Sequence, residues 1–331
     1  QQASTLNWAR SYRGEVLVLK EAMSIASIRR AYTNVLKRYF ALAGLSRSKT
    51  APMDMVQEAY SRVFGVRVRI EKSMRDTVYL AFKTDASGFS VLFEGHFFGK
   101  SKKQGISVRA PLSTCNPSKL CSAGCYAHDV LDAAPNAVTR GVINGLIAEH
   151  YEYDIRNTSE EIMVRLGSHV KDAVRYANKE VASLAGKWTR RPRIRFSHVG
   201  EIAEFPKFAN ALAQEILTES AGLVVPVIYT RHPNAKQLDP ELWVVNFTLD
   251  KSSLNRKAWA PPTSRIVFSA FGGEISESVD VNFLEHHRWS HMIPIGKGVV
   301  CPTTLPETRV RTCDAVRCDR CFETPLVVGV N

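Results

Sequence analysis

The chain has 331 residues, of which 45% are hydrophobic and 23% charged, and its formal net charge is +12. This composition is typical of a globular protein with a full hydrophobic core, in one large domain or two of ordinary size. No run approaches 18 apolar residues, and no secretory signal pattern stands at the N-terminus. The sequence therefore predicts a cytoplasmic protein with no membrane partner.

The positive charge is concentrated in the first third of the chain. Residues 1–110 hold 19 Lys and Arg against 8 Asp and Glu, whereas the rest holds 25 against 24. This asymmetry is typical of proteins that bind nucleic acid, although a basic surface can also serve solubility alone. We therefore predict a nucleic-acid partner for residues 1–110, contacted by Arg29, Arg30, Lys37, Arg38, Arg67, Arg69, Lys100, Lys102 and Lys103.

Residues 1–95 predict a small basic α+β unit. Apolar residues recur at helical spacing over 21–43, and a second helix is expected over 53–64. Residues 66–70 alternate apolar side chains with arginines, as a half-exposed strand does. Short apolar runs predict further strands at 78–82 and 90–93.

Residues 96–331 predict an α/β domain in which short apolar strands alternate with helices. Helices are expected over 134–154, 158–187 and 202–220, and strands over 106–110, 193–197, 223–229, 242–247, 265–269, 279–282, 298–300 and 326–330. Such alternation favours a mostly parallel sheet. We expect a complete or partial TIM-like (β/α) barrel, with an open doubly wound sheet as the alternative.

The seven cysteines form two groups, and none lies between Cys125 and Cys301. This clustering points to metal binding, because buried structural cysteines would be scattered along the chain. The first group, Cys115, Cys121 and Cys125, follows a predicted strand with the spacing C-x5-C-x3-C. Three thiolates can hold three irons of a [4Fe–4S] cluster and leave the fourth open to a small molecule. Zinc, with His128 or another cysteine as fourth ligand, is the alternative.

The second group has four cysteines, which suffice for a second cluster or for zinc. They are spaced C-x11-C-x4-C-x2-C and again follow a predicted strand end. In a closed barrel the first and last strands are neighbours, so the two groups could instead share one site. The group comprises Cys301, Cys313, Cys318 and Cys321.

Several motifs in order resemble the phage and plasmid proteins called gene-product-88-like. The resemblance covers about residues 99–331 and implies a mobile-element origin and a cysteine-bound cluster, but no reaction. It is carried by Gly99-Lys100, Ser107 to Cys115, Cys121, Gly124 to Ala127, Ser197, Gly200-Glu201, Tyr229 to Arg231, Cys301-Pro302, Thr312-Cys313, Cys318 and Cys321-Phe322.

A more distant resemblance is to radical SAM enzymes. Those enzymes also place a three-cysteine loop after the first barrel strand, usually with the spacing C-x3-C-x2-C. They place a Gly/Glu segment that holds the SAM amino group after the second strand. Gly200 and Glu201 follow the predicted strand 193–197 in the same way. The resemblance implies SAM as a cofactor and Gly200 and Glu201 as its ligands.

Other side chains at strand ends are ambiguous. Arg231 follows a predicted strand, where it could clamp a carboxylate or phosphate of a cofactor or form a structural ion pair. His198 and the pair His286 and His287 could be ligands or structural histidines. Asp280 stands at a strand start, where a structural role is expected. No catalytic residue is predicted, because no Ser-His-Asp order or nucleotide-binding glycine loop is present.

Together these patterns predict an iron–sulfur protein of a phage or plasmid that works as a radical SAM-like enzyme on nucleic acid or nucleotides. It would carry one or two [4Fe–4S] clusters and reside in the cytoplasm of the host cell. The alternative is a non-catalytic nucleic-acid-binding protein whose fold is held by structural zinc or iron–sulfur.

Overall fold

The structure is a computed structural model that describes part of the chain. It covers residues 93, 95–101, 105–110, 114–123, 135–154, 157–184, 189–197, 199–271, 274–285, 297–301, 313, 315–318 and 320–322. The predicted unit 1–95 lies outside these residues, apart from positions 93 and 95, and so does the predicted strand 326–330. None of the described helices is long and apolar enough to cross a membrane.

The described strands form one seven-stranded sheet whose order in space follows the order in sequence. The first two strands pair antiparallel, and every later pair is parallel. The strands are β1 (Gly99–Ser101), β2 (Gly105–Ser107), β3 (Arg193–Phe196), β4 (Val225–Thr230), β5 (Val244–Leu249), β6 (Arg265–Phe271) and β7 (Val281–Glu285).

The prediction of a mostly parallel α/β sheet is confirmed, but the described strands do not close into a barrel. β1 and β7 are the two edges of the sheet. Only one isolated parallel bridge, from Val300 to Asn282, extends the described sheet beyond β7. Closure needs further strands and a matching stagger, and six short parallel strands do not supply them.

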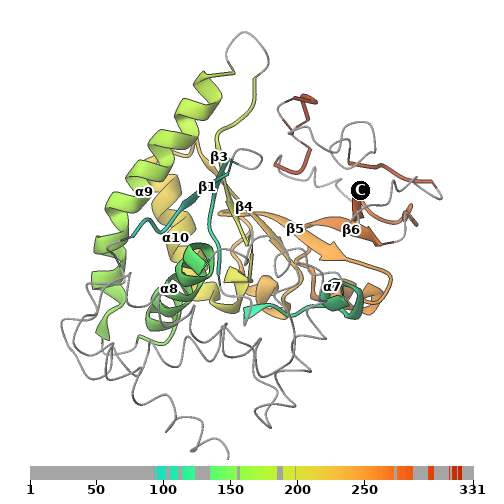
Figure 1. Cartoon of the computed structure of the whole chain (residues 1–331), viewed down its shortest axis with the longest axis horizontal. Coiled ribbons are helices and arrows are strands. Elements are labelled where there is room, and N and C mark those ends of the chain that lie inside the picture. The colour runs from blue at the N-terminus through green and yellow to red at the C-terminus, as the bar shows by residue number, and fades with distance from the viewer. Residues whose placement is uncertain are drawn as a thin grey trace, which may run out of the picture.

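Three helices cover one face of the sheet, as Figure 1 shows. Both α8 (Pro135–Glu152) and α9 (Ser159–Ala182) connect β2 to β3, and α10 (Pro206–Glu219) connects β3 to β4. Helix α9 is amphipathic: its buried residues, from Ile162 to Ala177, recur at three- and four-residue spacing. The next two crossovers, which are described in full, are shorter: η5 (Pro233–Gln237) lies between β4 and β5, and η6 (Leu254–Trp259) lies between β5 and β6.

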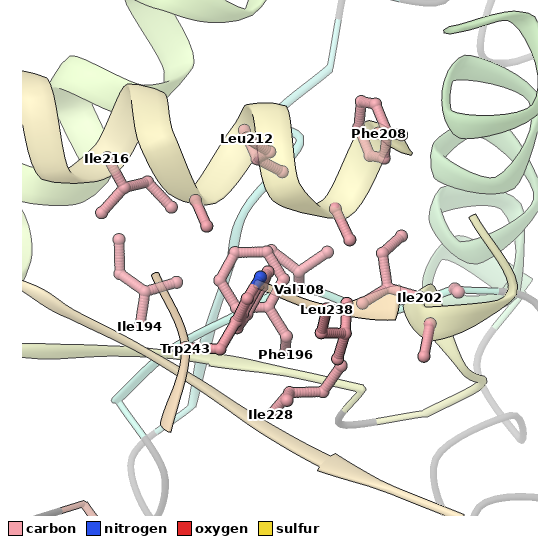
Figure 2. Packing of buried hydrophobic residues seen from close by; sticks show 14 of the residues in the cluster. Val108, Ile194, Phe196, Ile202, Phe208, Leu212, Ile216, Ile228, Leu238 and Trp243 are labelled. Atoms are coloured by element: carbon pink, nitrogen blue, oxygen red, sulfur yellow. The ribbon is translucent and has the colours of Figure 1, made fainter. Parts of the chain in front are cut away.

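The main core lies between these helices and the sheet (Figure 2). Ile194 and Phe196 of β3 face Leu212 and Ile216 of α10, and all four side chains are fully buried. The Phe196 ring meets the indole of Trp243 edge to face at 4.7 Å. Full burial of each such side chain contributes about 1.5–3 kcal/mol, so this layer fixes the positions of the central strands.

The opposite face of the sheet has a smaller core built partly from cysteines. Alternate residues of a strand point to opposite faces, and Val225, Val227, Val244 and Val281 all point away from the helices. Cys301, Cys321 and Phe322 pack on this valine wall. Figure 1 shows the described C-terminal segments on the side of the sheet away from α8, α9 and α10.

Candidate metal centre and active site

Polar segments gather where the parallel strands end. Thr114 and Cys115 follow β2, Glu201 follows β3, Arg231 follows β4 and Asp250 follows β5. Because parallel strands end at the same edge, this edge is where an α/β sheet presents ligand-binding loops. The structure thus confirms that the predicted residues Glu201 and Arg231 lie at strand ends.

Ser118 ties the first cysteine loop to the end of β5. Its hydroxyl donates a hydrogen bond to Asp250 Oδ2 and accepts hydrogen bonds from Arg231 Nη1 (3.2 Å) and Cys121 N (3.1 Å). It thereby caps the short helix α7 (Lys119–Ala123), which contains the second cysteine. Two long-range partners, Asp250 and Arg231, therefore hold the loop at Ser118.

Two further contacts fix the backbone of the same loop. Arg256 in η6 donates to the carbonyl oxygens of Asn116 (2.8 Å) and Pro117 (3.2 Å). Ser252 Oγ accepts a hydrogen bond from Leu120 N at 3.2 Å. The segment between Cys115 and Cys121 therefore lies across the loop that joins β5 to β6.

Arg231 is engaged by an acid of this same edge. Its Nη1 lies 3.0 Å from Asp250 Oδ2, and the two side chains are 12% and 0% exposed. Burial tends to raise the pKa of Asp250, but hydrogen bonds from Ser118 and Ser252 and the charge of Arg231 outweigh it and lower that pKa. Arg231 thus forms the structural ion pair that was one of its two expected roles. Binding of a cofactor by Arg231 stays a prediction.

Glu201 is a buried carboxylate with one oxygen left over. Its backbone N donates to Thr114 Oγ1 (2.8 Å), and its Oε1 accepts from Arg231 N (3.1 Å). Its Oε2 is fully buried and has no hydrogen-bond partner in the described structure. Desolvation raises the pKa of Glu201, against hydrogen bonds from Thr230 and Arg231. A buried acceptor without a donor is costly, so this oxygen needs an explanation.

The turn before Glu201 has the backbone geometry of a tight loop. Ser197 and Gly200 have φ of +57° and +72°. Ser197 Oγ accepts a hydrogen bond from Ile202 N at 3.1 Å, which closes the turn. Gly200 adopts the left-handed conformation without strain because it has no Cβ. The turn that it completes places the Glu201 side chain against the end of β4, where it meets Arg231 N.

The second cysteine group lies on the opposite, non-helical face of the sheet. Cys301 N donates to Asn282 O of β7 (2.7 Å), and the amide of Asn246 in β5 donates to Cys321 O (2.8 Å). Cys318 N donates to Cys313 O (3.0 Å), which folds these two cysteines into one turn. All four predicted ligands of this group thus belong to one packed segment over the sheet.

Gly298 allows Cys301 to reach this place. Its φ is +148°, and a Cβ there would stand 2.6 Å from Ser276 O and 2.9 Å from Asn282 Nδ2. Asn282 Nδ2 also donates to the carbonyl oxygens of Ser276 and Val299. A side chain at position 298 would therefore push the segment that ends in Cys301 away from β7.

Three arginines surround the second group with positive charge. The guanidinium of Arg193 stacks on Phe322 at 3.4 Å and that of Arg195 on Tyr229 at 4.2 Å. Arg265 donates to Oδ1 of Asn246 at 3.3 Å, and the amide nitrogen of the same Asn246 donates to Cys321 O. These charges suit an anionic tetrathiolate centre, because a divalent metal with four thiolates carries a net charge of about −2.

Two thiols of this group, those of Cys313 and Cys321, have raised pKa values. Burial raises the pKa of Cys313, while the charges of Arg193 and Arg195 oppose the rise. Burial raises the pKa of Cys321 to about 12, although the Tyr229 hydroxyl donates a hydrogen bond to it. Metal binding at this group would therefore release protons.

Within the described residues, no set of three or more His, Cys, Asp or Glu side chains lies close enough together to hold a metal ion. Cys125 of the first group lies outside those residues, whereas the second group is described in full. Metal binding by either group, and the division of the cysteines between sites, stay predictions.

The remaining predicted residues fall mostly outside the described part of the chain. Of the nine predicted nucleic-acid contacts, the structure describes Lys100, whose Nζ lies 3.9 Å from the Tyr176 ring centroid. His198, His286 and His287 are not described. Asp280 accepts a hydrogen bond from Ile266 N at 2.7 Å, which agrees with its expected structural role.

Sequence reasoning missed Ser118, Asp250 and Arg256. One signal was available, because Asp250 directly follows an apolar strand and precedes Ser252 and Ser253. A carboxylate at the end of a parallel strand is a candidate site residue wherever it occurs. Comparisons with protein families, with curated proteins and with solved structures give no match.

Proposed function

We propose that this chain is an iron–sulfur protein of a phage or plasmid that works as a radical SAM-like enzyme on nucleic acid or nucleotides. Cys115, Cys121 and Cys125 would hold a [4Fe–4S] cluster with one open iron. The observation that carries the proposal is the docking of the segment that holds Cys115 and Cys121 near a buried, unpartnered carboxylate oxygen of Glu201. The mobile-element origin rests on the resemblance of the motifs alone.

The strand order supports a partial TIM-like barrel. Six parallel strands follow one another in sequence order from β2 to β7, as consecutive strands of a (β/α) barrel do. Ligand sites of such folds lie at the C-terminal ends of the strands. The first cysteine loop, Glu201, Arg231 and Asp250 all belong to that edge.

Glu201 would bind the amino group of SAM. An ammonium donor placed against Oε2 would satisfy the unpartnered oxygen and restore the ionised carboxylate that burial disfavours. Thr114, one residue before Cys115, already accepts a hydrogen bond from the Glu201 backbone. This contact brings the proposed amine site close to the start of the cysteine loop.

When bound, such a cluster supplies the electron for cleaving SAM, and the chain's own residues orient the components and exclude water. Arg231, Asp250 and Ser118 would hold the loop rigid, since the Arg231–Asp250 pair is almost wholly buried. The second group would hold zinc or a second cluster, or lend a ligand to the first. The basic segment 1–110 would bring nucleic acid to the site.

A second candidate function is a non-catalytic nucleic-acid-binding protein in which metal holds the fold. The packing of Cys301 and Cys321 on the valine wall favours it, because metal there would join the chain after β7 to the sheet. Under this reading the first group would also be coordinatively saturated, and no small molecule would bind to it.

The test is anaerobic purification followed by iron, sulfide and zinc analysis, with EPR spectra of the reduced protein before and after adding SAM. We expect iron and sulfide, and a spectrum that SAM changes. The double variant C115A/C121A should lose that spectrum, and Glu201→Gln should keep the cluster but weaken the SAM effect. Glu219→Gln, an exposed site at the end of α10, is the matched control. Stoichiometric zinc without sulfide would favour the metal-stapled binding protein.

A further inference from the structure

A cavity of about 850 Å³ lies beside the edge strand β1, between that strand and helices α8 and α9. Its lining includes Gly99 and Lys100 of β1, Arg140 of α8 and a row of side chains on α9. This site is separate from the cysteine loop, which docks against the end of β5. A volume of this size is typical of pockets that take small organic ligands.

The charge of the lining is strongly positive. Four cations, Lys100, Arg140, Arg175 and Lys179, face a single carboxylate, that of Asp172. Asp172 pairs with Arg175 at 2.9 Å, but both side chains are mostly exposed, at 61% and 80%. Such an exposed pair contributes little, so a stronger anion can take its place at Arg175.

Two histidines also line the cavity. They are His96 and His169, and His169 Nδ1 accepts a hydrogen bond from Phe97 N at 3.4 Å. Burial lowers the pKa of His169, electrostatic interactions with His96 and Arg140 also lower it, and Asp172 opposes them. The positive charge of the cavity therefore comes from its Lys and Arg side chains and not from His169.

The rest of the cavity is apolar. Phe98, Ile106 and Ala173 contribute buried hydrophobic surface, and Tyr176 contributes an aromatic ring. That ring holds the Lys100 ammonium at 3.9 Å and so fixes one of the cations. Apolar surface beside a set of cations matches a ligand with a flat organic part and an anionic part.

We infer that this cavity binds a nucleotide unit, with its phosphate against Arg140, Arg175 and Lys179 and its base or ribose against the apolar surface. The unit can be a free nucleotide or one residue of a single strand, since both present the same chemistry. This assignment does not rest on the cysteine groups. It adds Arg140, Arg175 and Lys179 to the nucleic-acid contacts predicted for residues 1–110, of which Lys100 lines the same cavity.

The test measures the anisotropy of a fluorescein-labelled oligothymidylate with the full chain at several salt concentrations. The variant R175E/K179E should weaken binding by at least about tenfold and reduce the slope of log K against log salt by about 1.4, or about 0.7 for each lost phosphate contact. The matched control K236E/K257E makes the same charge change at exposed sites in η5 and η6. It should weaken binding less than about threefold by general electrostatics alone.

Equal losses in the two double variants, or no loss in R175E/K179E, would overturn the inference. Circular dichroism checks that each variant is folded, and the milder Lys179→Gln should still weaken binding if charge reversal disturbs α9. The variant C115A/C121A should bind the oligonucleotide as the wild type does, which separates this result from the outcome for the cysteine site.

Competition distinguishes the sources of the ligand. Displacement by AMP, with weaker displacement by inorganic phosphate, would support a site for a free nucleotide. Displacement by unlabelled oligonucleotide alone would support a strand. Equal displacement by AMP and inorganic phosphate would reduce the site to a simple anion site and overturn the role assigned to the apolar surface.

Discussion

The hydroxyl of Ser118 donates a hydrogen bond to the carboxylate of Asp250, although 132 residues separate them in the sequence. Asp250 is fully buried and also pairs with Arg231, whose guanidinium donates to the same hydroxyl. The conformation of the first cysteine loop is therefore coupled to the loops that follow β4 and β5. A loop fixed in this way can present its cysteines to a metal with little loss of chain entropy.

Ser118→Ala is expected to loosen this loop without unfolding the domain. The change removes the cap of α7 and one partner of Asp250, and we expect a loss of about 1–2 kcal/mol in unfolding free energy. Urea denaturation measures the loss, and hydrogen exchange should show faster exchange at Cys121. Ser278→Ala, at an exposed position near β7, serves as the control. Unchanged exchange at Cys121 would contradict the anchoring role.

Asp250→Asn should reveal a pH-dependent part of the stability. Because the folded-state pKa of Asp250 lies below its ordinary value of 3.8, its contribution is fully present above that value and is lost as pH falls through the folded pKa. At pH 7 the variant leaves the Arg231 charge without its buried partner, at a cost of about 3–5 kcal/mol. Denaturation at pH 7, 5 and 3 should show a constant difference from wild type down to about pH 4 and a smaller one below. A difference that stays constant to pH 3 would show that the carboxylate charge is not involved.

Glu201→Gln should stabilise the free protein at neutral pH. The folded-state pKa of Glu201 is raised above 4.5, so its ionisation opposes folding at higher pH, and this penalty disappears as pH falls to the unfolded value. We expect a gain of about 1–3 kcal/mol at pH 7 and almost none at pH 4. Thermal unfolding at the two pH values measures it, with Glu219→Gln as a control that should show no gain at either. A stabilising change that also weakens SAM binding would mark a residue retained for function.

Gly298→Ala should disturb the second cysteine group specifically. The new Cβ would stand 2.6 Å from Ser276 O in a backbone conformation that alanine rarely adopts. We expect a loss of about 1–3 kcal/mol and a lower content of the metal bound by Cys301, Cys313, Cys318 and Cys321. Metal analysis and calorimetry provide the measurement. Gly222→Ala also has positive φ but open space around it, so it separates backbone strain from the steric contact.

Removing metal should affect the two cysteine groups differently. Cys321 packs in one buried cluster with Val225 and Val244, and its carbonyl accepts a hydrogen bond from Asn246, so Cys321→Ser should lower both metal content and the melting temperature. C115A/C121A should lower metal content with a smaller change in melting, because Ser118, Arg256 and Ser252 hold the loop independently. Equal destabilisation by both changes would indicate one shared centre.

The larger elements could be predicted from periodicity, and the smaller ones could not. Helix α9 was expected over 158–187 and occupies Ser159–Ala182, and β4 was expected over 223–229 and occupies Val225–Thr230. Their apolar patterns face a continuous core, so the patterns are strong. Strand β1 has the sequence Gly-Lys-Ser and exists through its pairing with β2, which no local pattern encodes. Helix α7 has five residues and depends on contacts to Asp250 and Ser252.

The same division holds for the candidate site. Arg231 was predicted because it follows a strand, and Glu201 because its place after a strand resembles the Gly/Glu segment of radical SAM enzymes. The pair between Arg231 and Asp250 could not be predicted, because it depends on the side-by-side packing of the ends of β4 and β5. The valine wall beneath Cys301 and Cys321 depends on which face of the sheet each strand residue takes. A one-residue shift in register would move those valines to the helix side of the sheet. The spacing of residues in the sequence therefore could not show that the valines lie beneath the cysteines.

The order of the strands has a consequence for how the protein is made. Each strand from β3 onward pairs with the one synthesised just before it, so the sheet can grow strand by strand as the chain emerges. At about 5–20 residues per second, roughly 10–35 s pass between synthesis of Cys125 and of Cys301. The metal proposed for the first group could thus bind while the sheet is still being built. The second group would have its full set of cysteines only after β7 is in place, so the metal proposed there would bind later than the first.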